Sequence, residues 1–322
     1  MTTINKNIRI IYMGTPDFAV EPLKMLVERG YNVVAAVTVP DKPAGRGQKL
    51  QQSAVKTYAQ TVNLPVLQPV KLKDETFLTR LGSYNAELFI VVAFRMLPEI
   101  VWKMPPRGTF NLHASLLPQY RGAAPINWAI INGEKTTGVT TFFINEEIDT
   151  GKIIFATETE ITSTDNAETL HDKLMHAGAN LVLQTVDAIA QNTVCSKQQI
   201  TNGNLCTAPK IFKEMCKINW QQTPEKIYNF IRGLSPYPAA WCEFVTIYDL
   251  QIFSAKIYAS TYEITPHNLP FGTINSDGKT FLKIACNGGF INVTDIHLSG
   301  KKRLNIRDFL AGFRDVENYL IK

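Results

Sequence analysis

Residues 8–39 read IRIIYMGTPDFAVEPLKMLVERGYNVVAAVTV, and this stretch carries the pattern that decides the fold. The apolar run at 8–13 predicts a buried strand, the amphipathic stretch at 17–29 predicts a helix, and the apolar run at 33–39 predicts a second strand. Two parallel strands need a crossover of about a dozen residues or more, which is usually a helix. The chain is therefore expected to begin with an α/β domain.

The same alternation continues through the first 190 residues. Further continuous apolar runs predict buried strands, and two segments with a period of two predict a pair of strands at the sheet edge. The predicted elements are strands at 89–94 and 109–113, a helix at 124–131, edge strands at 136–144 and 152–161, and a long helix at 165–190 that begins with Thr164 or Asp165 as its cap.

A second domain is expected, because 322 residues exceed the usual size of one domain. Residues 191–209 are polar and without periodicity, which is typical of a linker. Beyond them, short apolar runs separated by Gly, Asn and Asp predict a small antiparallel barrel or sandwich. The predicted division is a domain at 1–190, a linker at 191–209 and a β-domain at 210–322.

Composition and charge exclude several classes of protein. No apolar stretch approaches the roughly 20 residues that cross a bilayer, and the N-terminus lacks the features of a signal peptide, so a cytoplasmic protein is expected. The five cysteines form no CxxC pair and no HExxH is present, so we expect neither a disulfide framework nor a metal. Residues 206–322 hold 14 Lys and Arg against 10 Asp and Glu, a modest excess that suits a phosphate-bearing partner.

The candidate catalytic residues lie in and after the segment 111–130, NLHASLLPQYRGAAPINWAI. Asn111 and His113 alternate on one predicted strand, so both side chains point to the same face, where ligands of α/β sheets bind. Asp149 follows another strand and precedes a Thr-Gly turn. An amide and an imidazole can polarise a carbonyl oxygen, and a nearby carboxylate can orient the histidine.

Each of these residues also has an ordinary structural explanation. Asn111 and Asp149 are common turn residues, and a single histidine is often part of a satisfied core. The chain has no GxSxG elbow and no Walker A loop, and MGTPDF at 13–18 does not match GxGxxG. An enzyme with this sequence is therefore expected to use a nucleophile that one substrate supplies.

The segment 40–53, PDKPAGRGQKLQQS, predicts a positively charged surface loop. Its prolines and glycines surround Lys42, Arg46 and Lys49, which suits contact with phosphates or base edges. A solvated loop without a partner has the same composition, and spacing alone leaves both interpretations open.

Five stretches together resemble the methionyl-tRNA formyltransferase family over nearly the whole chain. The HASLLPQYRG and DTG elements are shared with a wider set of folate-dependent formyltransferases, whereas the PAGRG loop and the C-terminal domain indicate the acceptor. These stretches are MGTPDFA at 13–19, PDKPAGRGQKL at 40–50, NLHASLLPQYRGAAPINWAI at 111–130, GVTTFFINEEIDTGKI at 138–153, and INW at 218–220 with IRGLSPYPAAW at 231–241.

The resemblance implies a Rossmann-like formyltransferase domain followed by a barrel similar to an OB-fold that binds tRNA. It implies 10-formyltetrahydrofolate as formyl donor, initiator methionyl-tRNA as acceptor, no metal, and a monomer in the cytoplasm. The implied roles are catalysis by Asn111, His113 and Asp149, folate contact by Ser115, Leu116, Leu117 and Pro118, and tRNA contact by Lys42, Arg46 and Lys49.

One segment departs from the family pattern. Relatives commonly carry VVAYGxxLP, whereas residues 91–98 read VVAFRMLP, with Phe94 and Arg95 in place of Tyr and Gly and one residue fewer. This segment is expected to border the folate pocket.

Two alternative functions remain open at this point: a formyltransferase that acts on another amine, and a nucleic-acid-binding barrel protein without catalysis.

Overall fold

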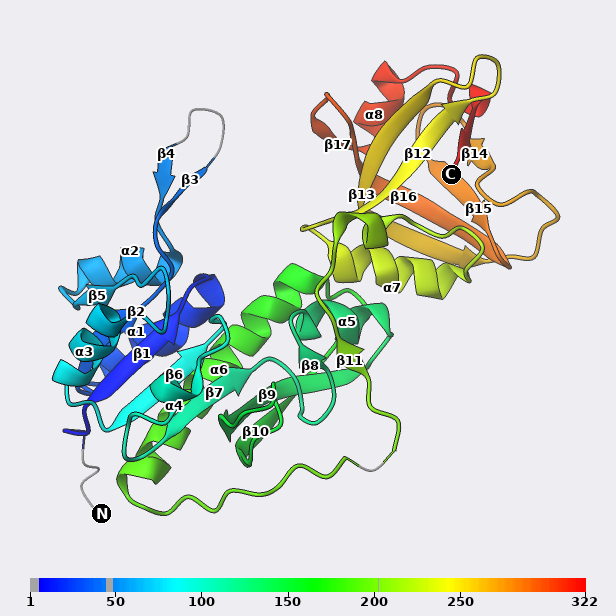
Figure 1. Cartoon of the computed structure of the whole chain (residues 1–322). Helices are drawn as coiled ribbons and strands as arrows, with labels where there is room; N and C mark the ends of the chain where they lie inside the picture. The colour runs from blue at the N-terminus through cyan, green and yellow to red at the C-terminus, as the bar shows by residue number, and fades with distance from the viewer. Residues whose placement is uncertain (1–5, 45–48, 202) are drawn as a thin grey trace. The chain divides into compact units, whose positions relative to one another are not determined.

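The computed structural model describes residues 6–44, 49–201 and 203–322, although the side chains of residues 44 and 49 are not described (Figure 1). The chain forms two compact units. The first runs to Gly122 and includes Thr136–Glu160 and His171–Thr207; the second contains Ala123–Lys135, Ile161–Leu170 and Ala208–Lys322. These units interleave along the chain, so the boundaries drawn at 190 and 209 stay a prediction. None of the described helices has the length and apolar character of a membrane span.

The first unit is built on a seven-stranded sheet, drawn from blue to green in Figure 1. Five neighbouring strands are parallel, and at one edge two further strands pair antiparallel, which confirms the predicted α/β class and edge pair. In sheet order the strands are β10 (Ile153–Glu160), β9 (Thr136–Phe143), β7 (Thr109–His113), β6 (Leu88–Val92), β1 (Ile10–Gly14), β2 (Val33–Val37) and β5 (Val66–Leu67).

Helices cover both faces of this sheet, as expected for parallel strands buried on both sides. On one face, Gly178 allows the backbone of the longest helix to approach Leu112, because a Cβ there would lie 2.7 Å from the leucine side chain. The helices are α1 (Val20–Glu28, after the 3-10 turn Asp17–Ala19), α2 (Ala54–Thr61), α3 (Glu75–Ser83), α4 (Glu99–Trp102) and α6 (Ala167–Ala190).

Several predicted boundaries differ from the structure by one or more residues, and two of these differences have a visible cause. The strand predicted at 89–94 ends at Val92, because Ala93 has a φ of 45° and turns the chain away from the ladder. The helix predicted from 165 begins at Ala167: the side chain of Asn166 accepts from the backbone N–H of Thr169, 2.9 Å away, and acts as the cap. Asp165 instead accepts from the backbone N–H of Thr162.

The parallel register decides which residues share a face with the catalytic candidates. Asn111 pairs with Val91 of β6, and Val91 belongs to the apolar core that Phe77 and Leu81 of α3 complete. Asn111 therefore lies on the α3 face, whereas Leu112 lies on the α6 face. His113, the last residue of β7, follows Asn111 on the same side.

The second unit is a nearly closed antiparallel barrel, which confirms the expected barrel. Thr273 forms an isolated bridge with Leu320, which brings the two ends of the strand order together. Its strands, in order, are β14 (Ile274–Ser276), β15 (Leu282–Cys286), β16 (Gly289–Leu298), β13 (Ile252–Ile264), β12 (Ala240–Thr246) and β18 (Tyr319–Ile321), with β17 (Arg303–Asn305) beside β16.

Helices close the apolar interior of this barrel. Ile227 and Ile231 of α7 are buried with Phe244 of β12 and Phe309 of α8 in one core. The remaining elements of the chain are α5 (Pro125–Ile131), α7 (Pro224–Leu234), α8 (Ile306–Gly312), the 3-10 turns Lys213–Cys216 and Val316–Asn318, the paired β8 (Arg121–Gly122) and β11 (Thr207–Ala208), and the hairpin β3 (Lys42–Ala44) and β4 (Lys49–Gln51).

Candidate active site

His113 and Asp149 come together beyond the carboxyl end of β7. His113 Nδ1 lies 3.8 Å from Asp149 Oδ2, and both side chains are largely buried, at 7% and 14% exposure. His113 Nε2 lies 2.9 Å from the carbonyl oxygen of Tyr120. Because a carbonyl can only accept, Nε2 carries the hydrogen, and Nδ1 is the nitrogen that faces Asp149. The tautomer of His113 is therefore set by the carbonyl group of Tyr120 and not by Asp149.

The turn that carries Asp149 has an unusual backbone. Asp149 has a φ of 56°, and its Oδ2 accepts from the backbone N–H of Gly122, 3.0 Å away. Two residues later, a Cβ at Gly151 would lie 1.6 Å from the carbonyl oxygen of Phe143. Only glycine fits there, which explains the Asp-Thr-Gly spacing: the small residue lets the turn press against β9 and aim the carboxylate inward.

Asn111 is the third member of the predicted group, and its side chain is part-buried. Among the described residues, no hydrogen-bond partner of its amide is found. A part-buried amide for which the described residues offer no partner, two residues before the carboxyl end of a strand, is available to a ligand. Asn111 can therefore donate to an oxygen that binds beside His113.

The predicted folate segment follows directly. Ser115 and Leu117 are buried, and Ser115 Oγ donates to the carbonyl oxygen of Gln119, 2.6 Å away. Thr140 of β9 binds the segment twice, since its hydroxyl donates to the Ser115 carbonyl and accepts from the Leu117 N–H. Leu116 and Pro118 are only partly buried, so they retain side-chain surface for a ligand.

Gln199 and Arg121 are functional candidates that sequence reasoning missed. Gln199 Nε2 lies 2.8 Å from the carbonyl oxygens of both Asp149 and Gly151. Its Oε1 accepts from Arg121, whose Nε is 3.1 Å away. Arg121 stands inside the quoted YRG element, but Gln199 lies in the predicted linker, where local sequence offered no signal.

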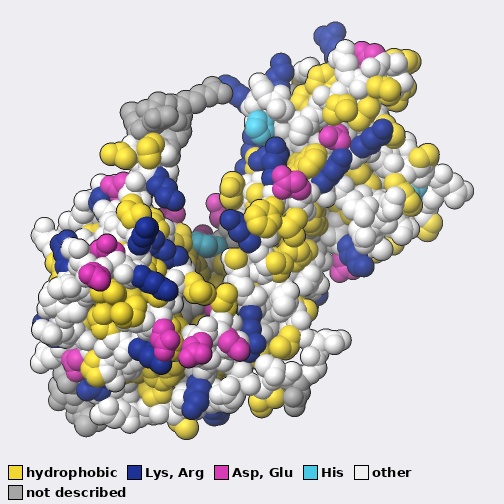
Figure 2. All heavy atoms as spheres, in the orientation of Figure 1, with side chains coloured by type: hydrophobic (Ala, Val, Ile, Leu, Met, Phe, Trp, Pro, Cys, Tyr) yellow, Lys and Arg dark blue, Asp and Glu magenta, His cyan; other side chains and the backbone are white. Residues whose placement is uncertain are grey.

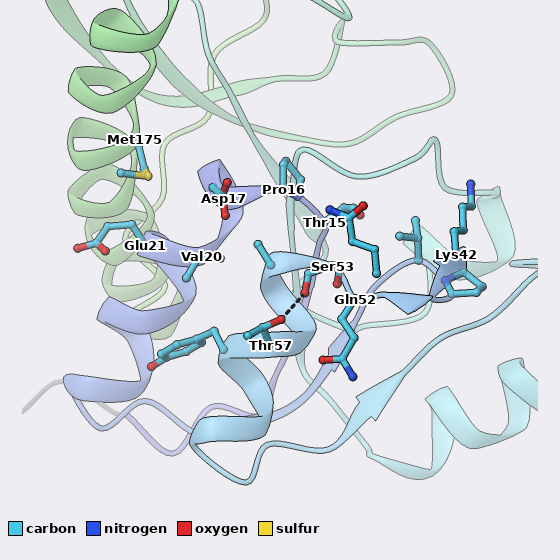
Figure 3. Close-up of a pocket in the computed structure, with 15 residues that line it drawn as sticks. Thr15, Pro16, Asp17, Val20, Glu21, Lys42, Gln52, Ser53, Thr57 and Met175 are labelled. Carbon is cyan, nitrogen blue, oxygen red and sulfur yellow. Dashed lines mark hydrogen bonds between the residues drawn. The ribbon is translucent and has the colours of Figure 1, made fainter. Parts of the chain in front are cut away.

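The basic hairpin rises from another part of the same unit. Lys42, at the start of β3, is exposed; Lys49 is the first residue of β4, and Arg46 lies outside the described residues. Beside the hairpin's base is a hollow of about 870 Å³. Figure 3 shows Lys42 on the side of this hollow opposite Asp17 and Glu21, with Ser53, the N-cap of α2, and Thr57 of α2 between them.

No group of three or more His, Cys, Asp or Glu side chains that could hold a metal is found among the residues that the structure describes. The site described above offers hydrogen-bond donors and one carboxylate. An amide, an imidazole and a carboxylate of this kind can stabilise an oxyanion and accept a proton.

Comparison with known proteins identifies the family. Residues 6–186 match the model for "Formyl transferase", and residues 210–314 match "Formyl transferase, C-terminal domain". Methionyl-tRNA formyltransferase of Bacteroides thetaiotaomicron is 57% identical over 317 residues, which cover 98% of each chain. The enzyme of the same name from Flavobacterium johnsoniae is 52% identical, over 95% of this chain and 96% of its own.

This chain belongs to the methionyl-tRNA formyltransferase family. Solved structures agree at the level of the fold. A sugar 3N-formyl transferase, crystallised in the presence of dTDP and 5-N-formyl-THF, superposes with a TM-score of 0.64 at 21% identity, over 92% of this chain and 99% of its own. A formyltransferase from Helicobacter canadensis gives a TM-score of 0.61 at 20% identity, over 89% and 98%.

The segment that departs from the usual pattern of methionyl-tRNA formyltransferases has its own internal partners. Arg95 Nη1 donates to the carbonyl oxygen of Val70, 2.9 Å away, and Nη2 donates to that of Pro69. Burial lowers the pKa of the Arg95 guanidinium. The side chain therefore ties the segment after β6 to the segment after β5.

Proposed function

We propose that this chain transfers the formyl group of 10-formyltetrahydrofolate to the α-amine of initiator methionyl-tRNA, with Asn111, His113 and Asp149 as the catalytic residues. The observation that carries the assignment is the meeting of His113 and Asp149, 3.8 Å apart, at the end of the strand that presents Asn111. The family membership favours this acceptor over another amine, and the paired catalytic side chains favour an enzyme over a barrel that only binds nucleic acid.

The site residues fit a bound formyl donor. Leu116 and Pro118 offer partly exposed apolar surface, and Asn111, whose amide has no hydrogen-bond partner among the described residues, precedes them on the same run of chain. Ser115 and Leu117 are buried, so we infer that they shape the segment through Thr140. When bound, 10-formyltetrahydrofolate supplies the formyl carbon and a weakly basic, aniline-like leaving nitrogen.

The protein's part in the transfer follows from the geometry. As the neutral amine adds to the formyl carbon, negative charge develops on the formyl oxygen, and Asn111 Nδ2 donates to it. His113 Nδ1 is the second proposed donor, which requires a ring with hydrogens on both nitrogens, and Asp149 would balance the charge of that form. In other enzymes the loss of one such donor costs about 2.7–4 kcal/mol of transition-state stabilisation.

Asp149 also handles the proton that the amine must lose. Its Oδ2 is held by the Gly122 N–H, which leaves Oδ1 as the base, directly or through water. The C–N bond to methionine forms, the bond from the formyl carbon to the folate nitrogen breaks, and the proton passes to that nitrogen. No covalent enzyme intermediate is required.

We also propose that both units contact tRNA, the first through Lys42, Arg46 and Lys49. The second contains a hollow of about 550 Å³ lined by Lys210, Lys213 and Lys256 and by the exposed Tyr237, which suit phosphates and bases. In the upper right of Figure 2, Lys and Arg side chains of this unit lie among hydrophobic ones. Trp220, in contrast, is buried in the barrel core and offers no stacking surface.

The test is transfer of radiolabelled formyl from 10-formyltetrahydrofolate to acid-precipitable tRNA, with initiator methionyl-tRNA, elongator methionyl-tRNA and uncharged tRNA in parallel. Labelling only of charged initiator tRNA is expected. Transfer to a small amine in place of tRNA would refute the acceptor, and folate binding without any transfer would refute the chemistry.

A further inference from the structure

The polar segment after α6 is bound to the first unit beside the site. Lys197 and Ile153 form a two-way backbone pair, with both N–H to carbonyl distances at 2.8 Å. Farther along, the Cys206 carbonyl accepts from the Tyr120 N–H at 2.7 Å, and the Cys206 N–H donates to Gln119 Oε1 at 2.8 Å. Between these two attachments lies Gln199, whose side chain is buried at 6% exposure.

Both the nitrogen and the oxygen of the Gln199 amide lie next to hydrogen-bonding groups of the complementary type. Its nitrogen has two hydrogens, and the two carbonyl oxygens of Asp149 and Gly151 each lie 2.8 Å away. Its oxygen faces the Arg121 guanidinium, which can only donate. A carboxylate at this position would keep the contact with Arg121 but lose both donations, and an apolar side chain would lose all of these part-buried hydrogen bonds.

Gln199 connects Arg121 to the Asp149–Gly151 turn, and each of these two segments contacts or contains a proposed catalytic side chain. Arg121 is flanked by Tyr120, whose carbonyl holds His113 Nε2, and by Gly122, whose N–H holds Asp149 Oδ2. The other end holds the carbonyl of Asp149 itself, in a residue whose φ of 56° is unfavourable without support. Gln199 therefore joins the two backbone segments whose spacing determines how the carboxylate faces the imidazole.

We propose that Gln199 is a positioning residue of the formyl transfer, which acts on Asp149 by clamping the carbonyls of the Asp149–Gly151 turn to Arg121. Residues 197–201, which carry Gln199, are then part of the active site as well as of a connection between domains. This inference rests on the proposed role of Asp149.

The experiment compares kcat and both KM values for Gln199→Ala, Gln199→Glu and the neighbouring control Gln198→Ala in the full-length protein. Gln198 is exposed. We expect kcat to fall about tenfold or more in both Gln199 variants, with KM for folate and tRNA within a factor of two, because misplaced catalytic groups affect the transition state rather than ground-state binding. Gln198→Ala should match the unaltered protein. Gln199→Glu preserves size and the Arg121 contact, so it keeps the test valid if Gln199→Ala unfolds.

A double-mutant cycle with Asp149→Asn separates positioning from a general loss of structure. If Gln199 acts through Asp149, Gln199→Glu should lower kcat less than about threefold in the Asp149→Asn background. An unchanged tenfold loss there, or normal kcat in the single Gln199 variants, would overturn the inference. Normal turnover of Asp149→Asn alone would instead refute the proposed catalytic site.

Discussion

The Asp149–Gly151 turn and the β3–β4 hairpin belong to the same compact unit, but they differ in how the rest of the unit contacts them. The turn is bound from three sides, by the Gly122 N–H, by the Gln199 amide and by close contact with Phe143. The hairpin is held at its base, where Asp41 accepts from Lys56 at 2.6 Å and from Gln68 at 2.7 Å. Beyond that base it presents the exposed Lys42.

The difference teaches what each task requires of the chain. Proton transfer and oxyanion stabilisation depend on donor and acceptor positions to within a fraction of an ångström, so the turn is fixed from several directions. Contact with a nucleic-acid backbone depends more on charge and reach, for which a short ladder fixed at its base is sufficient. The following changes test this contrast.

The largest effect is expected at the turn, from Asp149→Asn. The amide keeps an oxygen for the Gly122 N–H but cannot accept the proton of the amine, so kcat should fall by about a hundredfold or more. Single-turnover formyl transfer measures the loss, and Asn111→Ala should show a loss of similar size. Folate affinity, measured in parallel, should remain near normal in both variants; turnover at the normal rate would remove these residues from the catalytic group.

The next effect is expected from Gly151→Ala. The added Cβ would lie 1.6 Å from the Phe143 carbonyl, so the turn must shift, at a cost of about 1–3 kcal/mol in the free energy of unfolding and with a loss of kcat. The matched control is Gly82→Ala, since nothing lies within 4 Å of a Cβ at this helical glycine. The control should be neutral or gain up to about 1 kcal/mol. Equal urea midpoints for the two variants would contradict the tight turn.

A smaller and more selective effect is expected from Arg46→Ala in the hairpin. Loss of one phosphate contact should lower kcat/KM for tRNA about tenfold and reduce the salt dependence of log KM by about one, while folate binding is unchanged. Arg80→Ala, at an exposed position of α3, serves as the charge-matched control. An equal loss for tRNA and folate would mean that the hairpin does not act as a separate acceptor site.

The smallest effect concerns the hairpin's base. Hydrogen bonds from Lys56, and then from Gln68, lower the pKa of Asp41. A folded-state pKa below the ordinary value means that the contact stabilises the protein above the ordinary range of an aspartate and is lost as pH falls through the folded-state pKa. Asp41→Asn should therefore lower Tm by a few degrees at most at pH 7, and the difference should vanish in acid. A difference that grows on acidification would have the wrong sign.

The sequence by itself determined the class of the first unit and the identity of its catalytic candidates. Continuous apolar runs predicted β1, β2 and β6, because strands buried on both faces need apolar side chains at every position. Alternation on one strand placed Asn111 and His113 on one face, and the Asp-Thr-Gly triplet marked the turn of Asp149. All of these are local patterns with a fixed period or spacing.

Only the tertiary structure decided how these residues are supported. The link from Gln199 to Asp149 joins positions 50 residues apart, and the stretch around Gln199 is polar and aperiodic like any linker. The tautomer of His113 depends on the Tyr120 carbonyl, a backbone group that every residue possesses. Hydrogen bonds to backbone groups cannot be predicted from residue types, and contacts between residues far apart in the sequence do not appear in its periodicity. The groups that support the site could therefore be identified only from the folded structure.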